Sequence, residues 1–310
     1  MILSAGGTGG HLFPAMSLAA TLSDWDILFA AGGLKTNRYF DRTKFAHEEV
    51  ECATFSLKHP LQVLLGGGKI CRGIYQSRAL LRRFSPDLVV GFGSFCTLPL
   101  LVAAMIEGVP FVLHEQNTVP GKVNRLFSPF AHTMTITFPS TRAYLKKKAA
   151  HRAIEVVFPL RTGDRPSQES CWEYFGLRPG LPTLLIFGGS QGAARLNRLI
   201  QEALPSLPAI QVIHCTGNNE AAYEAKKAYD AYRIPACVKA FEPHMERAMH
   251  ISDCALTRAG AATISELIEY ELPALLIPYP FATDHHQEKN GEHFGLHVKG
   301  GKMYKESDLS

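Results

Sequence analysis

Three glycine-rich segments have the residue types and spacing best suited to chemistry. They are Gly6–His11 (GGTGGH), Gly91–Ser94 (GFGS) and Gly188–Ala193 (GGSQGA), and each follows a short apolar run. Glycine lets the backbone turn sharply and approach a ligand, and a helix that starts there offers unpaired N–H groups with partial positive charge. One such loop fits tight helix–strand packing equally well, but three of them favour a phosphate-bearing ligand.

The elements that must position these loops are short apolar runs alternating with amphipathic stretches. This alternation predicts an α/β fold with parallel sheets covered on both faces. The polar, proline-bearing stretch 159–170 separates two such series, which predicts two doubly wound domains, 1–158 and 159–310. Ligands in such folds bind beyond the carboxyl ends of the strands, so we expect the site in a cleft between the domains. The predicted strands are 2–5, 27–31, 88–92, 110–114, 133–137, 154–157, 183–187, 211–215, 236–241, 254–257 and 274–278.

Composition narrows the class of protein. Apolar residues make up 46% and charged residues 19% of the 310 residues, a balance typical of globular proteins. No apolar run reaches the about 18 residues of a membrane span, and the first residues lack the basic region of a signal peptide. A net charge of +4 is too small to indicate nucleic acid. None of the seven cysteines is spaced C-x-x-C, which favours reduced thiols in a cytosolic protein.

Other ligand classes fit less well. No acidic residue follows the 27–31 strand, where an NAD site requires one, and the Walker pattern is absent. Asp24-Trp25-Asp26 has the form of a D-x-D metal motif but precedes a strand, at the wrong end of the sheet. His285 and His286 are adjacent and would point apart on a helix, so they make a poor chelate pair. We therefore predict no metal site and no cofactor.

Several motifs together resemble the MurG family of glycosyltransferases, and the match runs from residue 1 to about 300. Two segments depart from the family pattern: Ser94 stands where a glycine is usual, and Phe158–Arg161 replaces Asn-Pro-Val-Arg. The family also continues several dozen residues past Ser310, with a helix that returns to the first domain. The matching motifs are Gly6–His11, His114–Asn117, Pro120-Gly121-x-x-Asn124, Gly188–Ala193, Arg258–Ala261-x-Thr263-x-x-Glu266 and Asp284-x-x-Gln287-x-x-Asn290.

The resemblance implies the GT-B fold, two Rossmann-like domains with a deep cleft, and an inverting transfer that needs no metal. N-acetylglucosamine would move from UDP-N-acetylglucosamine to the muramyl C4 hydroxyl of lipid I, giving lipid II for peptidoglycan, cell-wall growth and division. The N-terminal domain would face the acceptor and an anionic membrane surface, and the C-terminal domain would hold the donor. The implied location is peripheral, on the cytoplasmic face of the bacterial inner membrane.

The resemblance also assigns roles to single residues. His11 is the candidate general base for the acceptor hydroxyl, with ligand contact or capping of the loop as alternatives, and Glu115 as an alternative base. Glu266 would accept hydrogen bonds from both ribose hydroxyls; the alternative is that its charge only interacts favourably with the helix dipole.

The remaining predicted contacts concern the diphosphate, the uracil and the sugar. Ser190, the amides of residues 261–263 and Arg161 would hold the diphosphate, and the backbone of Glu242 would read uracil. Amide side chains at Asn117, Gln287 and Asn290 would bind the sugar, since each offers donors and an acceptor. The full predicted donor site is Thr8, Gly9, Gly10, Asn117, Arg161, Ser190, Glu242, Ala261, Ala262, Thr263, Ile264, Ser265, Glu266, Gln287 and Asn290.

A candidate membrane-contact segment begins at Pro60. The run 60–65 is apolar, and apolar tips with basic flanks suit anionic headgroups; an ordinary solvated helix is the alternative. The basic residues that follow are Lys69, Arg72, Arg78, Arg82 and Arg83. Two rival functions stay open: a UDP-N-acetylglucosamine 2-epimerase, and a non-catalytic nucleotide-sugar binding protein.

Overall fold

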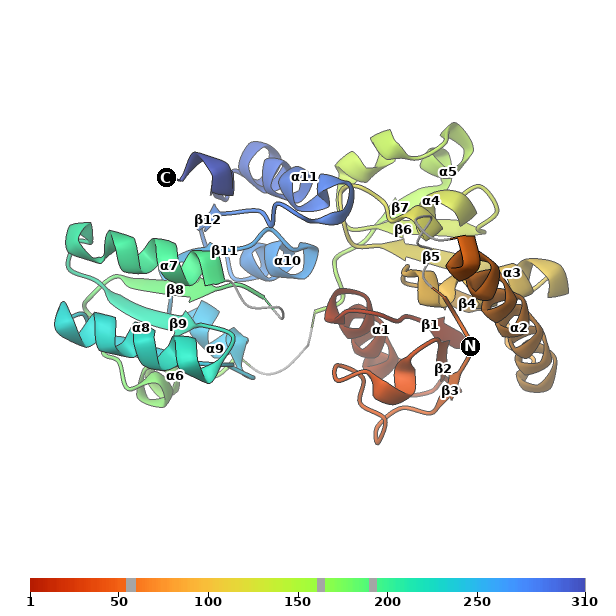
Figure 1. Ribbon diagram of the computed structural model, residues 1–310, viewed down its shortest axis with the longest axis horizontal. Helices are drawn as coiled ribbons and strands as arrows, with labels where there is room; N and C mark the ends of the chain where they lie inside the picture. The colour runs from red at the N-terminus through yellow and green to blue at the C-terminus, as the bar shows by residue number, and fades with distance from the viewer. Residues whose placement is uncertain (54–59, 161–164, 190–193, 310) are drawn as a thin grey trace. The chain divides into compact units, whose positions relative to one another are not determined.

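A parallel sheet with helices on both faces forms the centre of each of two units, Met1–Arg161 and Thr162–Ser310, in the computed structural model of the chain (Figure 1). The structure describes residues 1–53, 60–160, 165–189 and 194–309. The α/β class with two Rossmann-like sheets, predicted from the alternation of apolar and amphipathic segments, is thereby confirmed.

The described part of the first unit holds a seven-stranded sheet in the order β3-β2-β1-β4-β5-β6-β7, and all its pairings are parallel. Its strands are β1 (Ile2–Ser4), β2 (Leu28–Ala31), β3 (His47–Glu49), β4 (Val89–Gly91), β5 (Phe111–Glu115), β6 (Thr133–Ile136) and β7 (Ala153–Glu155). Its helices are α1 (Gly9–Thr21), α2 (Pro60–Phe84), α3 (Leu98–Glu107), α4 (Lys122–Phe127) and α5 (Lys147–Arg152).

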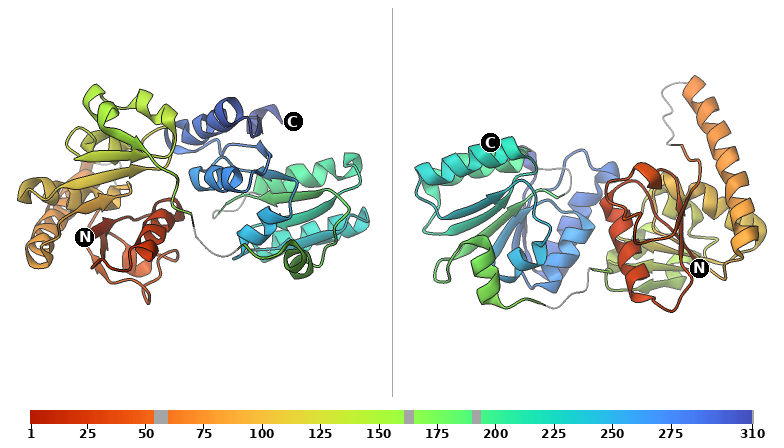
Figure 2. Two further views of the ribbon diagram at one scale, coloured as in Figure 1. Left: turned by 180° about the vertical axis from the view of Figure 1, so that it is seen from behind. Right: turned by 90° about the horizontal axis from the view of Figure 1, so that it is seen from below.

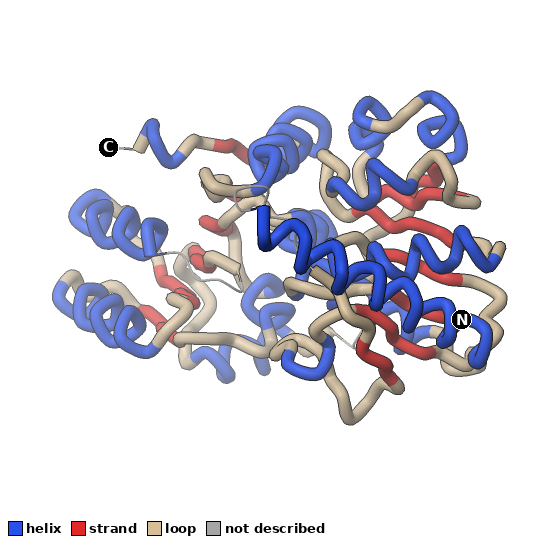
Figure 3. The backbone as a smooth tube through the Cα atoms, turned by 45° about the vertical axis from the view of Figure 1, so that its right-hand side comes forward, coloured by secondary structure: helices blue, strands red, loops and turns tan. Residues whose placement is uncertain are grey.

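Alternate side chains of these strands pack on opposite faces of the first sheet. Ile2 of β1 packs in one buried cluster with Leu101 of α3, whereas Leu3 packs in another with Leu12 of α1. Figure 3 shows the strands of this unit as neighbouring segments with helices on either side. Burial of both faces explains why the strands read as continuous apolar runs.

The described part of the second unit repeats the plan with six parallel strands in the order β10-β9-β8-β11-β12-β13. The strands are β8 (Thr183–Phe187), β9 (Gln211–Cys215), β10 (Ala236–Lys239), β11 (Cys254–Thr257), β12 (Ala274–Leu276) and β13 (Gly301–Met303). The helices are α6 (Gln168–Phe175), α7 (Ala194–Ala203), α8 (Asn219–Ala231), α9 (Met245–His250), α10 (Ala261–Glu269) and α11 (His286–His293).

The direction of winding reverses once in each sheet. The chain runs outward from β1 through β2 and β3, then returns to the other side of β1 at β4; the second sheet does the same at β8 and β11. Ligands of open parallel sheets bind at such switch points, beyond the carboxyl ends of the strands. The glycine-rich segments at residues 6–11 and 92–94 and the glycine pair at 188–189 follow β1, β4 and β8, so all three lie at a switch point.

The long helix α2 packs along α3 and passes very close to the chain that follows β3 (Figure 2). Gly73 is the point of closest approach, because a Cβ atom there would lie 1.9 Å from the carbonyl oxygen of Glu51. No side chain fits at that distance, so the position requires glycine although glycine is a weak helix former.

We predict that Gly73→Ala lowers the free energy of unfolding by about 1–3 kcal/mol, the usual cost of inserting a methyl group into a packed contact. Urea unfolding followed by circular dichroism measures the effect. The control is Gly67→Ala on the same helix, where a Cβ atom meets nothing within 4 Å. That variant should be as stable as the parent or more stable, by up to about 1 kcal/mol. Equal stability of the two variants would contradict the close approach.

Candidate active site

The first glycine-rich loop and the start of α1 coincide. Thr8 is the extended N-cap residue and α1 begins at Gly9, so the amides of Gly9 and Gly10 belong to the first turn and lack intrahelical acceptors. A Cβ atom on Gly6 would lie 2.7 Å from that of Cys96, and Gly7 has φ +80. The loop therefore presents main-chain donors at a place where larger side chains would not fit, with Thr8 and Gly10 exposed.

His11 lies half-buried in the first turn of α1, beside the loop after β4. Its Nδ1 is 2.8 Å from the carbonyl oxygen of Phe92. A carbonyl oxygen accepts and never donates, so Nδ1 carries the proton and the neutral ring leaves Nε2 as an unprotonated acceptor. Gly93, which has φ +86, lies against the ring, since a Cβ atom there would be 3.4 Å from Cε1 of His11, a van der Waals contact distance. The geometry is that of a histidine prepared to take up a proton at Nε2.

A buried carboxylate organises the loop after β5. Glu115 is 2% exposed, and its Oε1 accepts from the backbone N–H of Asn117 at 2.9 Å and from the Asn117 amide at 3.3 Å. Its Oε2 accepts from the backbone N–H of Gly121 at 3.0 Å and from the Asn124 amide at 2.8 Å. A carboxylate with both oxygens engaged in this way is a structural anion, so Glu115 is a poor alternative to His11 as the base.

His114 is a second, fully buried histidine close to His11. The Thr135 hydroxyl donates to the carbonyl oxygen of Leu113 at 3.3 Å and accepts from Nδ1 of His114 at 2.9 Å. Burial, and to a lesser extent the charge that His11 carries when protonated, lowers the pKa of His114 to about 4. His114 is therefore neutral at neutral pH and places no fixed positive charge beside His11.

Ser94 holds a strained backbone conformation in the loop after β4. Its φ of 78 and ψ of 149 lie next to the region that glycine alone populates readily. The hydroxyl accepts a long hydrogen bond of 3.4 Å from the backbone N–H of Cys96. This conformation gives a physical reason for the glycine that the family usually has here.

In the second unit, the N-terminus of α10 follows β11 at the switch point. Gly260 is the N-cap residue and has no side chain, so the first-turn amides of residues 261–263 are uncapped. The amide of Ile264 already donates to the carbonyl oxygen of Gly260, and the side chains of Ile264 and Ser265 are buried. Glu266 lies one turn further along and is partly exposed. The predicted diphosphate and ribose contacts thus come from one helix start, and they stay predictions.

The side chain of Glu242 is buried and engaged. Its carboxylate accepts from Lys239 Nζ at 2.6 Å, from the Tyr174 hydroxyl at 3.1 Å and from the backbone N–H of His244 at 2.7 Å. Such bonds fix the main chain just after β10, which is the group predicted to read uracil. The structure is compatible with that backbone role, which itself stays a prediction.

The predicted sugar-binding amides differ in their surroundings. Asn290 is completely buried and donates to the carbonyl oxygen of Ala259 at 3.1 Å, which ties α11 to the loop before α10. Gln287 is partly exposed, and its Oε1 accepts from the backbone N–H of Tyr279 at 2.8 Å. Asn117 is partly exposed and fixed by Glu115. Contact of any of the three with a sugar stays a prediction, and burial makes Asn290 the least accessible.

Two predicted phosphate ligands, Arg161 and Ser190, lie outside the described residues. Within the described residues, no group of three or more histidine, cysteine or acidic side chains could hold a metal ion. Asp24–Asp26 lie in the turn between α1 and β2, at the amino end of that strand. His285 contacts Glu288, whereas His286 contacts the carbonyl oxygen of Thr283. Helices long and apolar enough to cross a membrane are also absent from the described part of the chain.

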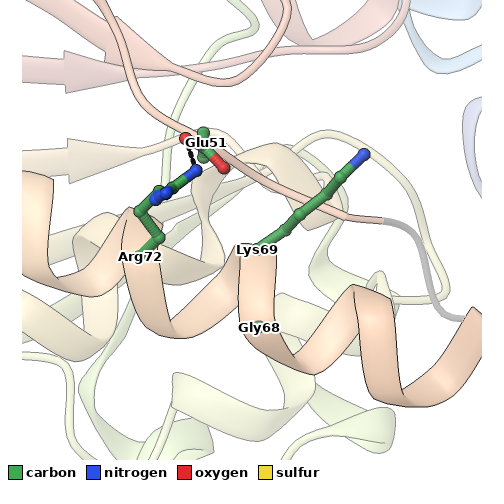
Figure 4. Close-up of a pocket in the computed structure, with 4 residues that line it drawn as sticks. All are labelled: Glu51, Gly68, Lys69 and Arg72. Atoms are coloured by element: carbon green, nitrogen blue, oxygen red, sulfur yellow. Dashed lines mark hydrogen bonds and ion pairs between the residues drawn. The ribbon is translucent and has the colours of Figure 1, made fainter.

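The basic residues of α2 are largely paired with acidic residues. Figure 4 shows an open hollow lined by Glu51, Gly68, Lys69 and Arg72, in which Arg72 turns toward Glu51 and Lys69 extends away from it. The ion pairs are Arg72–Glu51, Arg78–Glu107, Arg82–Glu107 and Arg83–Glu48. Among the described residues Lys69 has no acidic partner, so α2 offers less unpaired positive charge than its sequence indicates.

Comparison with known proteins gives close relatives. The "UDP-N-acetylglucosamine--N-acetylmuramyl-(pentapeptide) pyrophosphoryl-undecaprenol N-acetylglucosamine transferase" of Protochlamydia amoebophila (strain UWE25) is 46% identical over 309 residues, covering 97% of this chain and 81% of the relative. The crystal structure of Acinetobacter baumannii MurG matches with a TM-score of 0.78 and 25% identity, covering 100% of this chain and 86% of that one. UDP-GlcNAc 2-epimerase from Neisseria meningitidis, bound to UDP-GlcNAc, shares the fold alone, with a TM-score of 0.62 and 12% identity over 89% of this chain and 81% of that one.

The two Rossmann-like sheets, together with the match to the MurG crystal structure, place the chain among the glycosyltransferases of the GT-B fold. The profile of the glycosyltransferase family 28 N-terminal domain matches residues 1–136, and that of the C-terminal domain matches residues 183–310. The chain therefore belongs to glycosyltransferase family 28 and, within it, to the MurG family. This confirms the resemblance seen in the motifs.

Sequence reasoning gave Glu115 only the role of an alternative base and assigned no role to Gln116 or Asn124. All three side chains are buried. Gln116, at the end of β5, donates to the carbonyl oxygen of Phe92, and Asn124 of α4 donates to Glu115 and to the carbonyl oxygen of His114. The feature of the sequence that could have indicated Glu115 and Gln116 is the presence of polar residues at the end of an otherwise apolar strand, because polar residues are unusual at buried positions.

We predict that Ser94→Gly raises the free energy of unfolding by about 1 kcal/mol. Relief of the strained conformation is worth about 1–3 kcal/mol, and the greater backbone entropy of unfolded glycine offsets part of it. Thermal or urea unfolding measures the change. Ser85 also has a positive φ, of 48, so Ser85→Gly is the control and should change stability less, since φ there is close to the values that non-glycine residues adopt. A loss of stability in Ser94→Gly would show that the hydroxyl contributes more than the strain costs.

Proposed function

We propose that this chain transfers N-acetylglucosamine from UDP-N-acetylglucosamine to the muramyl C4 hydroxyl of lipid I, giving lipid II for peptidoglycan synthesis, with inversion at the anomeric carbon. The name of the Protochlamydia relative specifies this donor sugar and an acceptor carried on pyrophosphoryl-undecaprenol. The structural observation that carries the proposal is the hydrogen bond of 2.8 Å between His11 Nδ1 and the Phe92 carbonyl oxygen.

His11 acts as the general base. In an inverting transfer the acceptor hydroxyl attacks the anomeric carbon from the face opposite the leaving group and loses its proton as it does so. Nε2 of His11 takes up this proton, and the Nδ1–H bond to Phe92 supports the positive charge that develops on the ring. The bond from the anomeric carbon to the UDP oxygen breaks in the same step, and UDP leaves as an anion.

The charge on the leaving diphosphate is stabilised by main-chain amides. The uncapped amides of residues 261–263 at the start of α10 supply partial positive charge, and we expect Ser190 and Arg161 to add donors. Glu266 accepts the ribose hydroxyls, the main chain at Glu242 reads uracil, and Asn117, Gln287 and Asn290 serve the sugar. The amides of Thr8, Gly9 and Gly10 complete the contacts from the first glycine-rich loop. The proposal assigns no role in this reaction to a metal ion.

We further propose that the chain acts peripherally, at the cytoplasmic face of the bacterial inner membrane. An undecaprenol-linked acceptor has its lipid in the bilayer, so the enzyme must meet the membrane surface. Helix α2 suits this role, because Lys69 has no acidic partner among the described residues and Tyr75 is 74% exposed. The ion pairs of Arg78, Arg82 and Arg83 reduce the attraction for anionic headgroups that the sequence suggests.

Incubation with UDP-N-acetylglucosamine and a lipid I analogue tests the function, and His11→Ala tests the base. The parent chain should release UDP and form a disaccharide, whereas the variant should lose about 10²–10⁴-fold in kcat with little change in donor KM. The control is His151→Ala, which removes an exposed histidine of α5 and should keep parental kinetics. A manno sugar formed without acceptor would identify an epimerase, and UDP binding without release would identify a binding protein.

We predict that Glu266→Ala raises the donor KM by about tenfold or more, because each charged hydrogen bond to a ribose hydroxyl is worth about 1.5–3 kcal/mol. Steady-state kinetics with varied UDP-N-acetylglucosamine measure the effect. Glu269→Ala removes an exposed carboxylate further along α10, one paired with Arg165, and serves as the control. If both variants have the parental donor KM, Glu266 does not bind the ribose.

A further inference from the structure

One carbonyl oxygen accepts hydrogen bonds from two side chains, and one of the two is the candidate base. The oxygen of Phe92 lies 2.8 Å from Nδ1 of His11 and accepts from Nε2 of Gln116 at 3.1 Å. The Phe92 residue is itself held, because its backbone N–H donates to the carbonyl oxygen of Ser4 at 2.8 Å. Three chain segments, at the ends of β1, β4 and β5, therefore converge on Phe92, whose carbonyl group orients His11.

We propose that Gln116 is a positioning residue for the transfer: it fixes the Phe92 carbonyl and thereby keeps His11 in the tautomer whose Nε2 can accept the acceptor's proton. The inference rests on the proposed function, in which His11 is the base. Gln116 does not touch the reacting atoms in this scheme, and it acts through the carbonyl oxygen that it shares with His11.

The direction of both hydrogen bonds follows from elementary chemistry. Because the Phe92 oxygen accepts, the Gln116 amide must present Nε2 and not Oε1, and the His11 ring must present a protonated Nδ1. A side chain at position 116 without a donor would leave the carbonyl with His11 as its remaining side-chain partner. The peptide group could then rotate, and the ring would no longer be confined to the Nδ1–H form. Loss of orientation of a reacting group by about 1 Å is enough to lower a rate substantially.

The surroundings of Gln116 indicate that its Nε2 is the important atom. The side chain is 2% exposed, and Oε1 has no hydrogen-bond partner within the described residues. The bond to Phe92 is the hydrogen bond that the structure gives this amide. The neighbouring side chains have different partners. Glu115 and Asn124 hydrogen-bond within the segment that follows β5, whereas Gln116 hydrogen-bonds the residue that follows β4.

A purely structural role for Gln116 is the alternative, and it makes a different prediction. If the bond merely closes the end of the β4–β5 pair, its loss lowers stability but leaves the protonation pattern of His11 and the chemical step unchanged. The test therefore needs a readout of the His11 ring itself. Nitrogen NMR of histidine-labelled protein supplies one, since it distinguishes Nδ1–H from Nε2–H rings, and His11→Ala identifies the His11 signals by their absence.

The experiment compares Gln116→Met with the full-length parent in both NMR and kinetics. In the parent, neutral His11 should be protonated at Nδ1. In Gln116→Met the ring should show a mixture of tautomers, and kcat should fall by at least about threefold, up to the about 10²–10⁴-fold of a lost base, with donor KM unchanged. Gln76→Met is the matched control, because the amide of Gln76, which lies on α2, bonds Glu51 and not Phe92. It should keep the parental tautomer and kcat.

Two results would overturn the proposal. One is a parental Nδ1–H signal and a control-like kcat in Gln116→Met; the other is a changed tautomer with an unchanged kcat. If Gln116→Met does not fold, Gln116→Leu, which also lacks a donor, replaces it in the same measurements. His11→Ala shows which of the two proposals fails. If His11→Ala is inactive and Gln116→Met behaves like the control, only the positioning role of Gln116 is wrong. If His11→Ala is active, the assignment of His11 as the base is wrong, and the inference about Gln116 is wrong with it.

Discussion

In both sheets the winding direction reverses between two central neighbours, β1 and β4 in the first and β8 and β11 in the second. A reversal leaves the loops after those two strands without a covering crossover between them, so main-chain donors are exposed there. The first-turn amides of α1 and α10 both arise in this way. The exposed main-chain donors therefore follow from the order of the strands. The loops need only small residues for a ligand to reach these donors.

Buried polar groups around His11 follow one electrostatic rule. A charge is buried where donors surround it, as at Glu115, and a titratable ring is buried neutral where they do not, as at His114. Glu115 orders the loop of residues 116–124, and four N–H groups compensate its charge. His114 provides bulk without a competing positive charge.

The core strands and the glycine-rich loops were predictable because burial and close approach restrict residue type. The bounds of β8, β9 and β11 match the expected segments, since all three lie inside the sheet and consist mainly of apolar residues. The edge strands β3 and β13 escaped prediction: the first reads His-Glu-Glu and the second Gly-Lys-Met, so neither shows an apolar period. Hydrogen-bond partners were beyond reach as well, because the choice between Glu115 as a base and as a loop anchor depends on three-dimensional neighbours. The sequence shows that Ser94 replaces a glycine usual in the family, but the backbone strain at this position is evident only from the structure.

The shared Phe92 oxygen has a consequence for how substitutions in this region combine. His11 and Gln116 come from different elements and are 105 positions apart in the sequence, yet both bonds end on one atom. The free-energy effects of changing them cannot be independent, since removing either partner alters the electron density and the freedom of the carbonyl that the other uses. Their contributions form one coupled quantity. A double-mutant cycle across this oxygen would yield an interaction energy that belongs to the pair, and neither single variant would report the worth of its own residue.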